Sequence, residues 1–466
     1  MSQPRARIAI IGGGPGGYEA ALVAAQLGAE VTVVERDGLG GACVLTDCVP
    51  SKTLIATSGM MAGLEEASVL GIRINSDGNE ADLLDAPRLY ARVRALARAQ
   101  SADVASRLSA EGVKVIAGPG RLIGPRLVAT GDIEIEADAV LVATGAEPRV
   151  LAGAEPDGER ILTWRQLYDL DELPEELIVV GSGVTGAEFA SAYQALGSQV
   201  TLISSRDRVL PHEDADAAMV VEEVFRRRGM TVLGHSRAEL VTRTSTGVIV
   251  TLLDGRTVAG THCLLTVGMV PNTRGLGLAE AGIMVDDRGF VQVDKVSRTS
   301  APGVYAAGDC TGVLMLASVA AMQGRIAMWH ALGEAVKPLR LSHVAATIFT
   351  EPEIAKVGVP EQAVASGQIA DAIVVKLPLA TNARAKMQGF RDGFVKLIAQ
   401  RSSGTVLGGV IVAPRASELI LAVSLAVERL LTVDHLAQTF SVYPSLSGSV
   451  TEAARRLMQP VERADG

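Results

Sequence analysis

The sequence predicts an α/β protein with two Rossmann-like dinucleotide-binding domains and an α+β domain at its C-terminal end. Three observations carry this prediction. An apolar strand, a glycine-rich turn, a helix and a second apolar strand follow one another near the N-terminus, and the same pattern recurs near residue 180. The C-terminal part has two strand-like segments, "GFVKLIAQ" and "VLGGVIVA", followed by two helix-like segments. A chain of 466 residues also exceeds what a single hydrophobic core supports.

Composition is typical of a globular protein and argues against several classes of function. Apolar residues make up 48% and charged residues 20% of the chain. The formal net charge of -9, the 3% aromatic content and the lack of a basic stripe predict no nucleic-acid partner. Apolar runs are too short for an integral membrane segment, and the N-terminus does not resemble a signal peptide. With only four cysteines, we expect a cytoplasmic protein.

The first glycine-rich turn lies in "ARIAIIGGGPGGYEAALVAAQLGAEVTVVE". Gly12 permits the tight turn, Gly14 lets a pyrophosphate approach the backbone, and Gly17 allows close packing of helix and strand. The helix that follows presents unpaired N–H groups to the phosphates. Glu35 ends the next strand, where a carboxylate can bind a ribose diol. This segment therefore predicts a dinucleotide site.

The second turn lies in "ELIVVGSGVTGAEFASAYQALGSQVTLISSRDR", with Gly181, Gly183 and Gly186 at the equivalent positions. Two such turns in one chain indicate two bound dinucleotides. Between residues 60 and 110, Ala, Arg and Leu recur at helical spacing, which predicts a long helical excursion from the first domain.

The second site differs from the first at the end of its second strand. Ser204 stands where the first site has Glu35, and Arg206 and Arg208 follow it. Without a carboxylate a 2′-phosphate is not repelled, and a guanidinium can bind it through two hydrogen bonds. We therefore expect NADPH to be accepted, with NADH not excluded. The alternative is that both arginines are solvated loop residues.

Two further strand ends belong with the first turn. "VLVATGAEP" runs from a buried strand into small residues at Thr144 and Gly145. "GVYAAGDCTG" ends another buried strand at Asp309, which is placed to hydrogen-bond a polyol such as ribitol. Each alone could be an ordinary strand end, but both accompany a dinucleotide turn.

Cys43 and Cys48 stand five positions apart in "GGACVLTDCVPSKT". In a regular helix their Cα atoms would be roughly 8.7 Å apart, beyond the ~7 Å reach of a disulfide. A bridge therefore needs an irregular turn before a helix from about Pro50. A redox pair and inert thiols both remain open, whereas a metal site is unsupported because no C-x2-C and no nearby histidine occur. Cys263 and Cys310 lie in apolar segments and are expected to be buried.

Together these features resemble the flavoprotein disulfide reductases, the family of lipoamide dehydrogenase, glutathione reductase and mercuric reductase. The resemblance runs from about residue 5 to about residue 457. It rests on the two glycine turns, C-x4-C-x-P-S-K at 43–52, A-T-G at 143–145, Glu188, A-x-G-D at 306–309 and "FTEPEIAKVG". It implies an FAD-binding domain at 1–150 and 271–340, an NAD(P)-binding domain at 151–270, and an interface domain at 341–466 that forms a homodimer or a higher homo-oligomer.

The resemblance also implies roles for individual residues. Cys48 would lie against the flavin as the charge-transfer thiolate, and Cys43 would be the outer sulfur. Lys52 would sit near flavin N5, paired with Glu188. A helix beginning near Ala317 would point its N-terminus at the flavin pyrimidine edge. The expected cofactor-binding residues also include Gly41, Lys52 and Gly268.

The chain departs from the family pattern near its C-terminus. In H-P-T-x-x-E, the histidine of one subunit serves the disulfide of the other, but here Tyr443, Ser445 and Gly448 replace the histidine, threonine and glutamate. Met269 also stands where an arginine is usual. Thiol–disulfide exchange needs an acid–base group, and tyrosine, with a pKa near 10, is a poor one at neutral pH.

These departures predict an NAD(P)H oxidoreductase whose flavin passes its electrons to a quinone, not an efficient lipoamide dehydrogenase. Members of the family without the histidine–glutamate pair are often classed as lipoamide-dehydrogenase-like NAD(P)H:quinone reductases, and the chain resembles these most. The alternative is an NAD(P)H-dependent reductase of a small disulfide that uses Cys43 and Cys48, with its acid from the substrate or from Tyr443. A non-enzyme alternative is an idle FAD/NADP-binding subunit.

Overall fold

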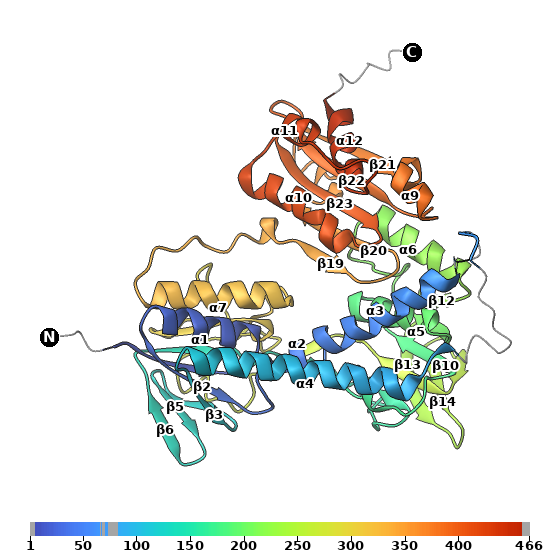
Figure 1. Ribbon diagram of the computed structural model, residues 1–466. Coiled ribbons are helices and arrows are strands. Elements are labelled where there is room, and N and C mark those ends of the chain that lie inside the picture. The colour runs from blue at the N-terminus through green and yellow to red at the C-terminus, as the bar shows by residue number, and fades with distance from the viewer. Residues whose placement is uncertain (1–4, 66, 68–69, 73–82, 459–466) are drawn as a thin grey trace.

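The computed structural model describes residues 5–65, 67, 70–72 and 83–458 (Figure 1). Parts of the helical excursion expected at 60–110 (residues 66, 68–69 and 73–82) and the end of the expected interface domain (459–466) lie outside the described residues. No helix in the described part is long and apolar enough to cross a membrane.

The first sheet is parallel and joins segments far apart in sequence, in the order β18-β7-β1-β2-β3. Its strands are β1 (Arg7–Ile11), β2 (Glu30–Glu35), β3 (Lys114–Ala117), β7 (Ala139–Val142) and β18 (Val304–Ala306). Helices α1 (Pro15–Gln26) and α7 (Ala317–Ala331) lie side by side on it (Figure 1). The chain beyond residue 300 thus returns to the N-terminal sheet.

The second sheet repeats this arrangement, in the order β12-β11-β10-β16-β9. Its strands are β9 (Ile161–Leu162), β10 (Glu176–Val180), β11 (Gln199–Ile203), β12 (Thr231–Leu233) and β16 (His262–Leu265). They accompany helices α5 (Val184–Ala195) and α6 (Ala215–Arg227) and an antiparallel sheet of β13 (Ala238–Arg243), β14 (Val248–Leu252) and β15 (Thr257–Gly260). The two Rossmann-like units predicted from the glycine turns are therefore present.

The helical excursion leaves the first sheet and packs on the second. It consists of α2 (Gly41–Leu45), α3 (Cys48–Glu65) and α4 (Ala86–Ala110) (Figure 1). Leu54 and Tyr90 are fully buried in one apolar core with residues of the second sheet. Because α3 starts from the redox-motif cysteine, this packing fixes the motif between the two nucleotide-binding units.

Smaller elements complete the two units. An antiparallel sheet contains β4 (Arg121–Gly124), β5 (Leu127–Thr130) and β6 (Ile133–Glu136). A two-stranded sheet pairs β8 (Ala146–Pro148) with β17 (Met269–Pro271). Two 3-10 helices are η2 (Leu167–Asp169) and η3 (Asp309–Thr311). The β8–β17 pair lies at the passage between the two units.

The C-terminal domain is α+β, as predicted. Its antiparallel sheet has the order β19-β20-β23-β22-β21, with β19 (Ala346–Ile348), β20 (Glu353–Gly358), β21 (Ala372–Pro378), β22 (Phe394–Gln400) and β23 (Val406–Ala413). Its helices are α8 (Glu361–Ala365), α9 (Ala383–Met387), α10 (Ala416–Arg429), α11 (Val433–Gln438) and α12 (Gly448–Leu457), with η4 (Leu341–His343) and η5 (Leu379–Thr381). Near-continuous apolar runs in β22 and β23 explain their burial.

A salt-bridge cluster joins this domain to α6. Lys396 of β22 has a side chain only 1% exposed, and its ammonium contacts Asp214 at 2.9 Å, Asp216 at 2.8 Å and Glu361. Burial lowers the pKa of Lys396, but its hydrogen bonds to the three carboxylates outweigh this and raise it. The three carboxylates lie close enough together to hold a metal ion, yet they already bind an ammonium. We therefore interpret the cluster as a contact between domains.

Candidate redox-active site

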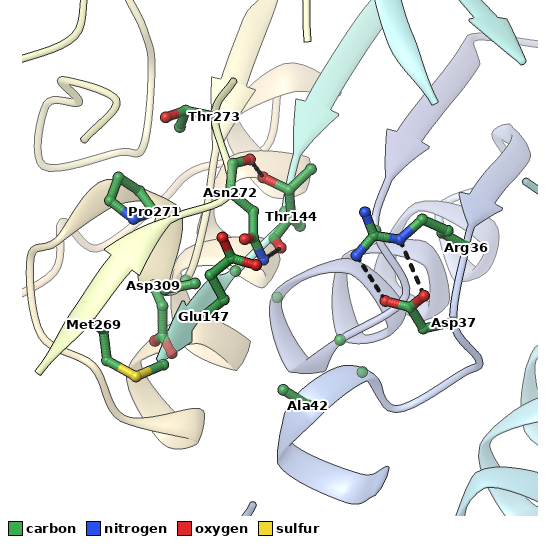
Figure 2. A pocket seen from close by; sticks show the side chains of 18 of the residues that line it. Arg36, Asp37, Ala42, Thr144, Glu147, Met269, Pro271, Asn272, Thr273 and Asp309 are labelled. Carbon is green, nitrogen blue, oxygen red and sulfur yellow. Dashed lines mark hydrogen bonds and ion pairs between the residues drawn. The ribbon is translucent and has the colours of Figure 1, made fainter. Parts of the chain in front are cut away.

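A cavity of about 1530 Å³ runs along the first sheet to the α2–α3 junction (Figure 2). Drug-sized ligands typically occupy about 300–1,000 Å³, so this cavity can hold a larger molecule. It brings together many residues singled out from the sequence: Gly12, Gly14, Glu35, Gly41, Cys43, Cys48, Thr144, Gly145, Asp309 and Ala317. Gly17, Lys52, Glu188, Gly268 and Tyr443 do not line it.

The first glycine turn has no room for side chains on its inner side. A Cβ on Gly12 would lie 2.3 Å from the Ala143 carbonyl oxygen, and a Cβ on Gly17 would lie 1.9 Å from that of Gly12. A Cβ on Gly14 would meet nothing closer than 4.0 Å, so open space adjoins the N-terminus of α1. Glu35 accepts a hydrogen bond of 2.5 Å from the Gly13 N–H. This geometry fits a pyrophosphate with a ribose beside it.

The second turn has the same geometry. A Cβ on Gly181 would lie 2.4 Å from the Thr266 carbonyl oxygen, and one on Gly186 would lie 1.9 Å from that of Gly181. Gly183 faces open space. The N-terminus of α5 therefore offers a second phosphate site.

Ser204 is fully buried, which the sequence did not reveal. Its hydroxyl is hydrogen-bonded to the Ser182 hydroxyl at 2.7 Å and accepts from the Arg206 N–H at 3.1 Å. Ser205 and Arg206 are exposed, whereas Arg208 is half-buried. Ser204 therefore holds this turn through hydrogen bonds, and the side chains accessible to a ligand are those of Ser205 and Arg206.

Thr144 and Asn272 lie side by side in the wall of the cavity (Figure 2). The Thr144 hydroxyl donates to the Asn272 carbonyl at 2.7 Å, and the Asn272 amide donates to the Thr144 carbonyl at 3.0 Å. Sequence reasoning missed Asn272, because this pairing joins segments distant in the chain. Gly145 has a φ of 69° and Gly268 a φ of 98°, which favour glycine at both positions.

The expected acid of the polyol site also faces the cavity. Asp309 begins η3 beside the N-terminus of α7. Burial, with a smaller contribution from the Asp47 carboxylate, raises the pKa of Asp309 to about 6. An acidic group with a raised pKa is suited to hydrogen-bond hydroxyl groups, since it need not stay ionised.

Cys43 and Cys48 lie on different helices. Cys43 belongs to α2, Thr46 and Asp47 interrupt the helical run, and α3 begins at Cys48, two residues before Pro50. The irregular turn required for a bridge is therefore present. Both cysteines are free, and the Cys48 thiol donates a hydrogen bond to Cys43, which lowers the pKa of Cys43 and raises that of Cys48. Cys263 and Cys310 are fully buried, as predicted.

Lys52 and Glu188 form an ion pair directly behind the cysteines. Lys52 Nζ lies 2.8 Å from Glu188 Oε2, and Glu188 Oε1 accepts a hydrogen bond of 2.9 Å from the Phe349 N–H. Burial lowers the pKa of Lys52, but the carboxylates of Glu188 and Asp47 and the Cys48 sulfur outweigh burial, and the pKa is raised. Lys52 therefore stays a cation at neutral pH.

Tyr443 is not part of the cavity. Its residue is 85% exposed, next to the exposed Phe440 and Val442. The Tyr443–Pro444 peptide bond is cis, and Gly448 starts α12. The segment thus lies on the surface of the isolated chain.

Two charged residues that sequence reasoning missed line the cavity at the cysteines. Asp47 stands between α2 and α3, and Arg165 follows β9. The Nε atom of Arg165 is buried without a hydrogen-bond partner in the described part of the chain. The position of Asp47 directly before Cys48 was the only sequence signal for either residue.

Comparison with protein families decides the relationship. The family model for pyridine nucleotide-disulphide oxidoreductases matches residues 6–324. The model for the dimerisation domain of the same family matches residues 344–454. The chain belongs to this family. It is therefore an FAD-dependent NAD(P)H oxidoreductase, and the resemblance to flavoprotein disulfide reductases is confirmed. The dimerisation-domain match indicates a homodimer.

Relatives match along nearly the whole chain. NAD(P)H dehydrogenase (quinone) of Mycobacterium tuberculosis is 60% identical over 466 residues, covering 97% of this chain and 94% of that protein. Dihydrolipoyl dehydrogenase of Chlorobaculum tepidum is 35% identical over 463 residues, covering 97% of each. The crystal structure of LpdA from Mycobacterium tuberculosis matches with a TM-score of 0.92 and 58% identity, covering 97% of this chain and 100% of that one. The flavoprotein disulfide reductase RclA from Escherichia coli matches at 0.86 and 26%, covering 96% and 99%.

The residues of the pyridine nucleotide-disulphide oxidoreductase site fit the family's cofactors. The open space above Gly14 and the large cavity suit FAD, and the open space above Gly183 suits NAD(P). A bound FAD supplies reversible two-electron chemistry. The chain's own groups would hold it by the N-terminus of α1, by Glu35 and by Asp309.

Proposed function

We propose that this chain is an NAD(P)H:quinone oxidoreductase that sends its electrons from the reduced flavin directly to a quinone. The replacement of the family's C-terminal histidine and glutamate by Tyr443 and Gly448 carries this proposal. A phenol is a weak acid–base group at neutral pH and a glycine has no side chain, so neither replaces the imidazole and carboxylate that serve thiol–disulfide exchange in the family. The quinone activity in the name of the relative that is 60% identical supports the same conclusion.

Direct reduction of a quinone requires few catalytic groups from the protein. A quinone is planar and takes up two electrons, with protons available from solvent, so it needs no thiol intermediate. Lys52, held by Glu188, keeps a positive charge behind the cysteines, and the N-terminus of α7 at Ala317 adds a partial positive charge at the cavity wall. Both charges would stabilise negative charge on an FAD bound in this cavity, and FAD would supply the hydride-accepting chemistry.

The second site supports NADPH as one of the accepted nucleotides. Ser205 and Arg206 follow β11 and are exposed, and Ser204 leaves no carboxylate to repel a 2′-phosphate. Arg206 is the group we assign to that phosphate. NADH remains a possible second donor, since no residue of this turn excludes it.

Reduction of a small disulfide is the second candidate function. The direct hydrogen bond between the Cys48 and Cys43 thiols favours it, because two sulfurs that meet can form a bridge. An idle subunit is disfavoured, because the Lys52–Glu188 pair is intact beside these thiols.

The double substitution of Cys43 and Cys48 by serine tests the electron route. NADPH oxidation is measured with a benzoquinone, with lipoamide and without acceptor. Direct transfer predicts that the double variant keeps its benzoquinone turnover within about a factor of three. A collapse to the acceptor-free rate would show that electrons pass through sulfur, and rapid lipoamide turnover by the wild type would favour the second function. No turnover with either acceptor would favour the idle subunit.

A homodimer would bury the C-terminal segment that is exposed in the isolated chain. Phe440, Val442 and Tyr443 are 103%, 77% and 85% exposed, which is unusual for neighbouring large apolar side chains. We propose that this segment is buried against the second subunit, consistent with the dimerisation-domain match. Size-exclusion chromatography with light scattering measures the oligomeric state, and a monomer would contradict this proposal.

A further inference from the structure

Asp47 occupies the two-residue break between the helices that carry the cysteines. The backbone N–H of Asp47 donates a hydrogen bond of 2.8 Å to the carbonyl of Ala42, the residue of α2 that precedes Cys43. Its own carbonyl accepts from the Ser51 N–H at 2.7 Å in the first turn of α3. The backbone on both sides thus fixes Asp47 beside both sulfurs.

Asp47 is half-buried and lines the cavity that Cys43 and Cys48 also line. An aspartate at a helix N-terminus normally accepts a hydrogen bond from the backbone of the first turn. Asp47 makes no such bond, and within the described residues its carboxyl has neither a hydrogen bond nor an ion pair. Its oxygens are therefore available to the reacting groups in the cavity.

Titratable and charged side chains from several elements lie around this carboxyl and the thiols. They are Lys52 of α3, Glu188 of α5, Arg165 after β9, Asp309 of η3, Tyr168 of η2 and, toward Cys43, Tyr18 of α1. Burial raises the pKa of Asp47, against the lowering effect of Lys52 and Arg165. The Asp47 carboxylate in turn raises the pKa of both Cys43 and Cys48. The carboxyl and the thiols therefore share one ionisation equilibrium.

We propose that Asp47 carries the proton of the Cys43–Cys48 pair, the task for which this chain has no C-terminal imidazole. Among the carboxylates around the pair, Glu188 is bound to Lys52 and to the Phe349 N–H, and Asp309 belongs to η3 at the polyol site, whereas Asp47 is unengaged in the described residues and directly precedes Cys48. A carboxyl beside both thiols with no other partner can take a proton from a thiol and return it, and burial, which raises its pKa, makes it a better proton acceptor.

The proton and electron balance is complete. Reduction of a Cys43–Cys48 disulfide takes two electrons and two protons. Hydride from NAD(P)H, with FAD bound as its carrier, would supply both electrons and one proton, and Asp47 supplies the second proton, which it regains from solvent before the next cycle. When Cys43 attacks a small disulfide, its proton moves to Asp47, the substrate S–S bond breaks, and Asp47 protonates the departing thiolate. Attack of Cys48 on Cys43 then restores the bridge, and the Cys48 proton leaves with the second thiol.

Thiol alkylation of the dithiothreitol-reduced holoenzyme tests this proposal without any electron acceptor. Iodoacetamide reacts with the thiolate, and peptide mass spectrometry gives the rate at Cys43 as a function of pH. The wild type is expected to show two ionisations. Asp47→Asn should lose the ionisation that belongs to the carboxyl, and the remaining thiol ionisation should be displaced to lower pH by about one unit because a neighbouring negative charge is gone.

Asp47→Ser is the second variant, since Asn and Ser both remain good helix N-cap residues and preserve the fold. Asp103→Asn, an exposed position of α4, is the control and should keep the wild-type profile. Unchanged profiles in both Asp47 variants would overturn the proposal. The inference rests on the second candidate function, the reduction of a small disulfide, and does not depend on the quinone assignment. A wild type without quinone turnover would refute the quinone assignment and leave the alkylation result standing.

Discussion

Lys52 Nζ lies 2.8 Å from Glu188 Oε2, and this ion pair joins three parts of the fold. Lys52 belongs to α3, Glu188 to α5 on the second sheet, and the other oxygen of Glu188 binds the Phe349 N–H of the C-terminal domain. Lys52 also lies 5.0 Å from the centre of the Phe349 ring. The pair therefore positions a cation at the redox motif and also holds the domains that surround it.

Glu188→Gln removes the charge partner of Lys52 but can still accept the Phe349 N–H. We expect it to lower the pKa of Lys52 and the free energy of unfolding by about 2 kcal/mol. This is less than the ~3–5 kcal/mol of a fully buried pair, since Lys52 is 31% exposed. Urea unfolding measures the change. Glu452→Gln, which breaks exposed ion pairs on α12, is the control and should cost under about 1 kcal/mol. Equal losses in both variants would contradict this account.

The local parts of the site could be predicted from the sequence. Gly12 and Gly181 need positive φ values. A Cβ added to Gly17 or Gly186 would lie 1.9 Å from a carbonyl oxygen. Such constraints leave glycine as the only choice, so a pattern within a few residues reveals them. The strands around them are also local, because continuous apolar runs indicate a buried parallel sheet.

The remaining parts arise from contacts between distant segments. Asn272 reaches Thr144 only because β17 returns beside β8. Ser204 comes directly after β11 and Glu35 is the last residue of β2, but the Ser204 hydroxyl is hydrogen-bonded to the buried Ser182, and no sequence pattern shows this. The availability of a free carboxyl at residue 47 likewise depends on what the helices on either side leave unpaired.

Lys396→Met tests the salt-bridge cluster between the C-terminal domain and α6. The variant leaves Asp214, Asp216 and Glu361 close together without a cation. Because breaking a buried pair strands its partners, we expect a loss of about 3–5 kcal/mol in urea unfolding. Lys337→Met, whose ion pair with Glu428 is exposed, is the control and should cost under about 1 kcal/mol. A loss no larger than the control's would show that the three acids are stable without Lys396.

Asp309→Asn should change how the stability of the FAD-free protein depends on pH. The folded-state pKa of Asp309 is about 6, above the ordinary 3.8, so wild-type stability is complete below pH 4 and falls as pH rises through 6. The variant lacks this loss and should be more stable at pH 7, by at most about 3 kcal/mol, and similar at pH 4. Urea unfolding across this range measures it. Parallel pH curves for the two proteins would rule out the titration of Asp309 as the cause.

Arg206→Ala should separate the two nicotinamide nucleotides. Loss of a guanidinium that binds the 2′-phosphate removes about 1.5–3 kcal/mol, which raises KM for NADPH by about 10-fold or more. KM for NADH should stay within a factor of two. Arg243→Ala, an exposed arginine on β13 paired with Asp157, is the control. Equal effects on both nucleotides would place Arg206 outside the phosphate site.

The combined substitution Tyr443→His with Gly448→Glu should restore acid–base catalysis at the sulfurs. Gly448 can accept a side chain, because a Cβ there would lie 3.7 Å from its nearest neighbours, the Ser441 and Ser445 hydroxyls. An imidazole alone lacks a carboxylate to orient it, so neither single variant should suffice. If the missing pair limits thiol exchange, NADPH-dependent lipoamide reduction in the dimer rises about 100-fold in the double variant, while benzoquinone reduction is unchanged. A dimeric double variant without this gain would show that proton handling at Tyr443 is not what separates this chain from the disulfide reductases.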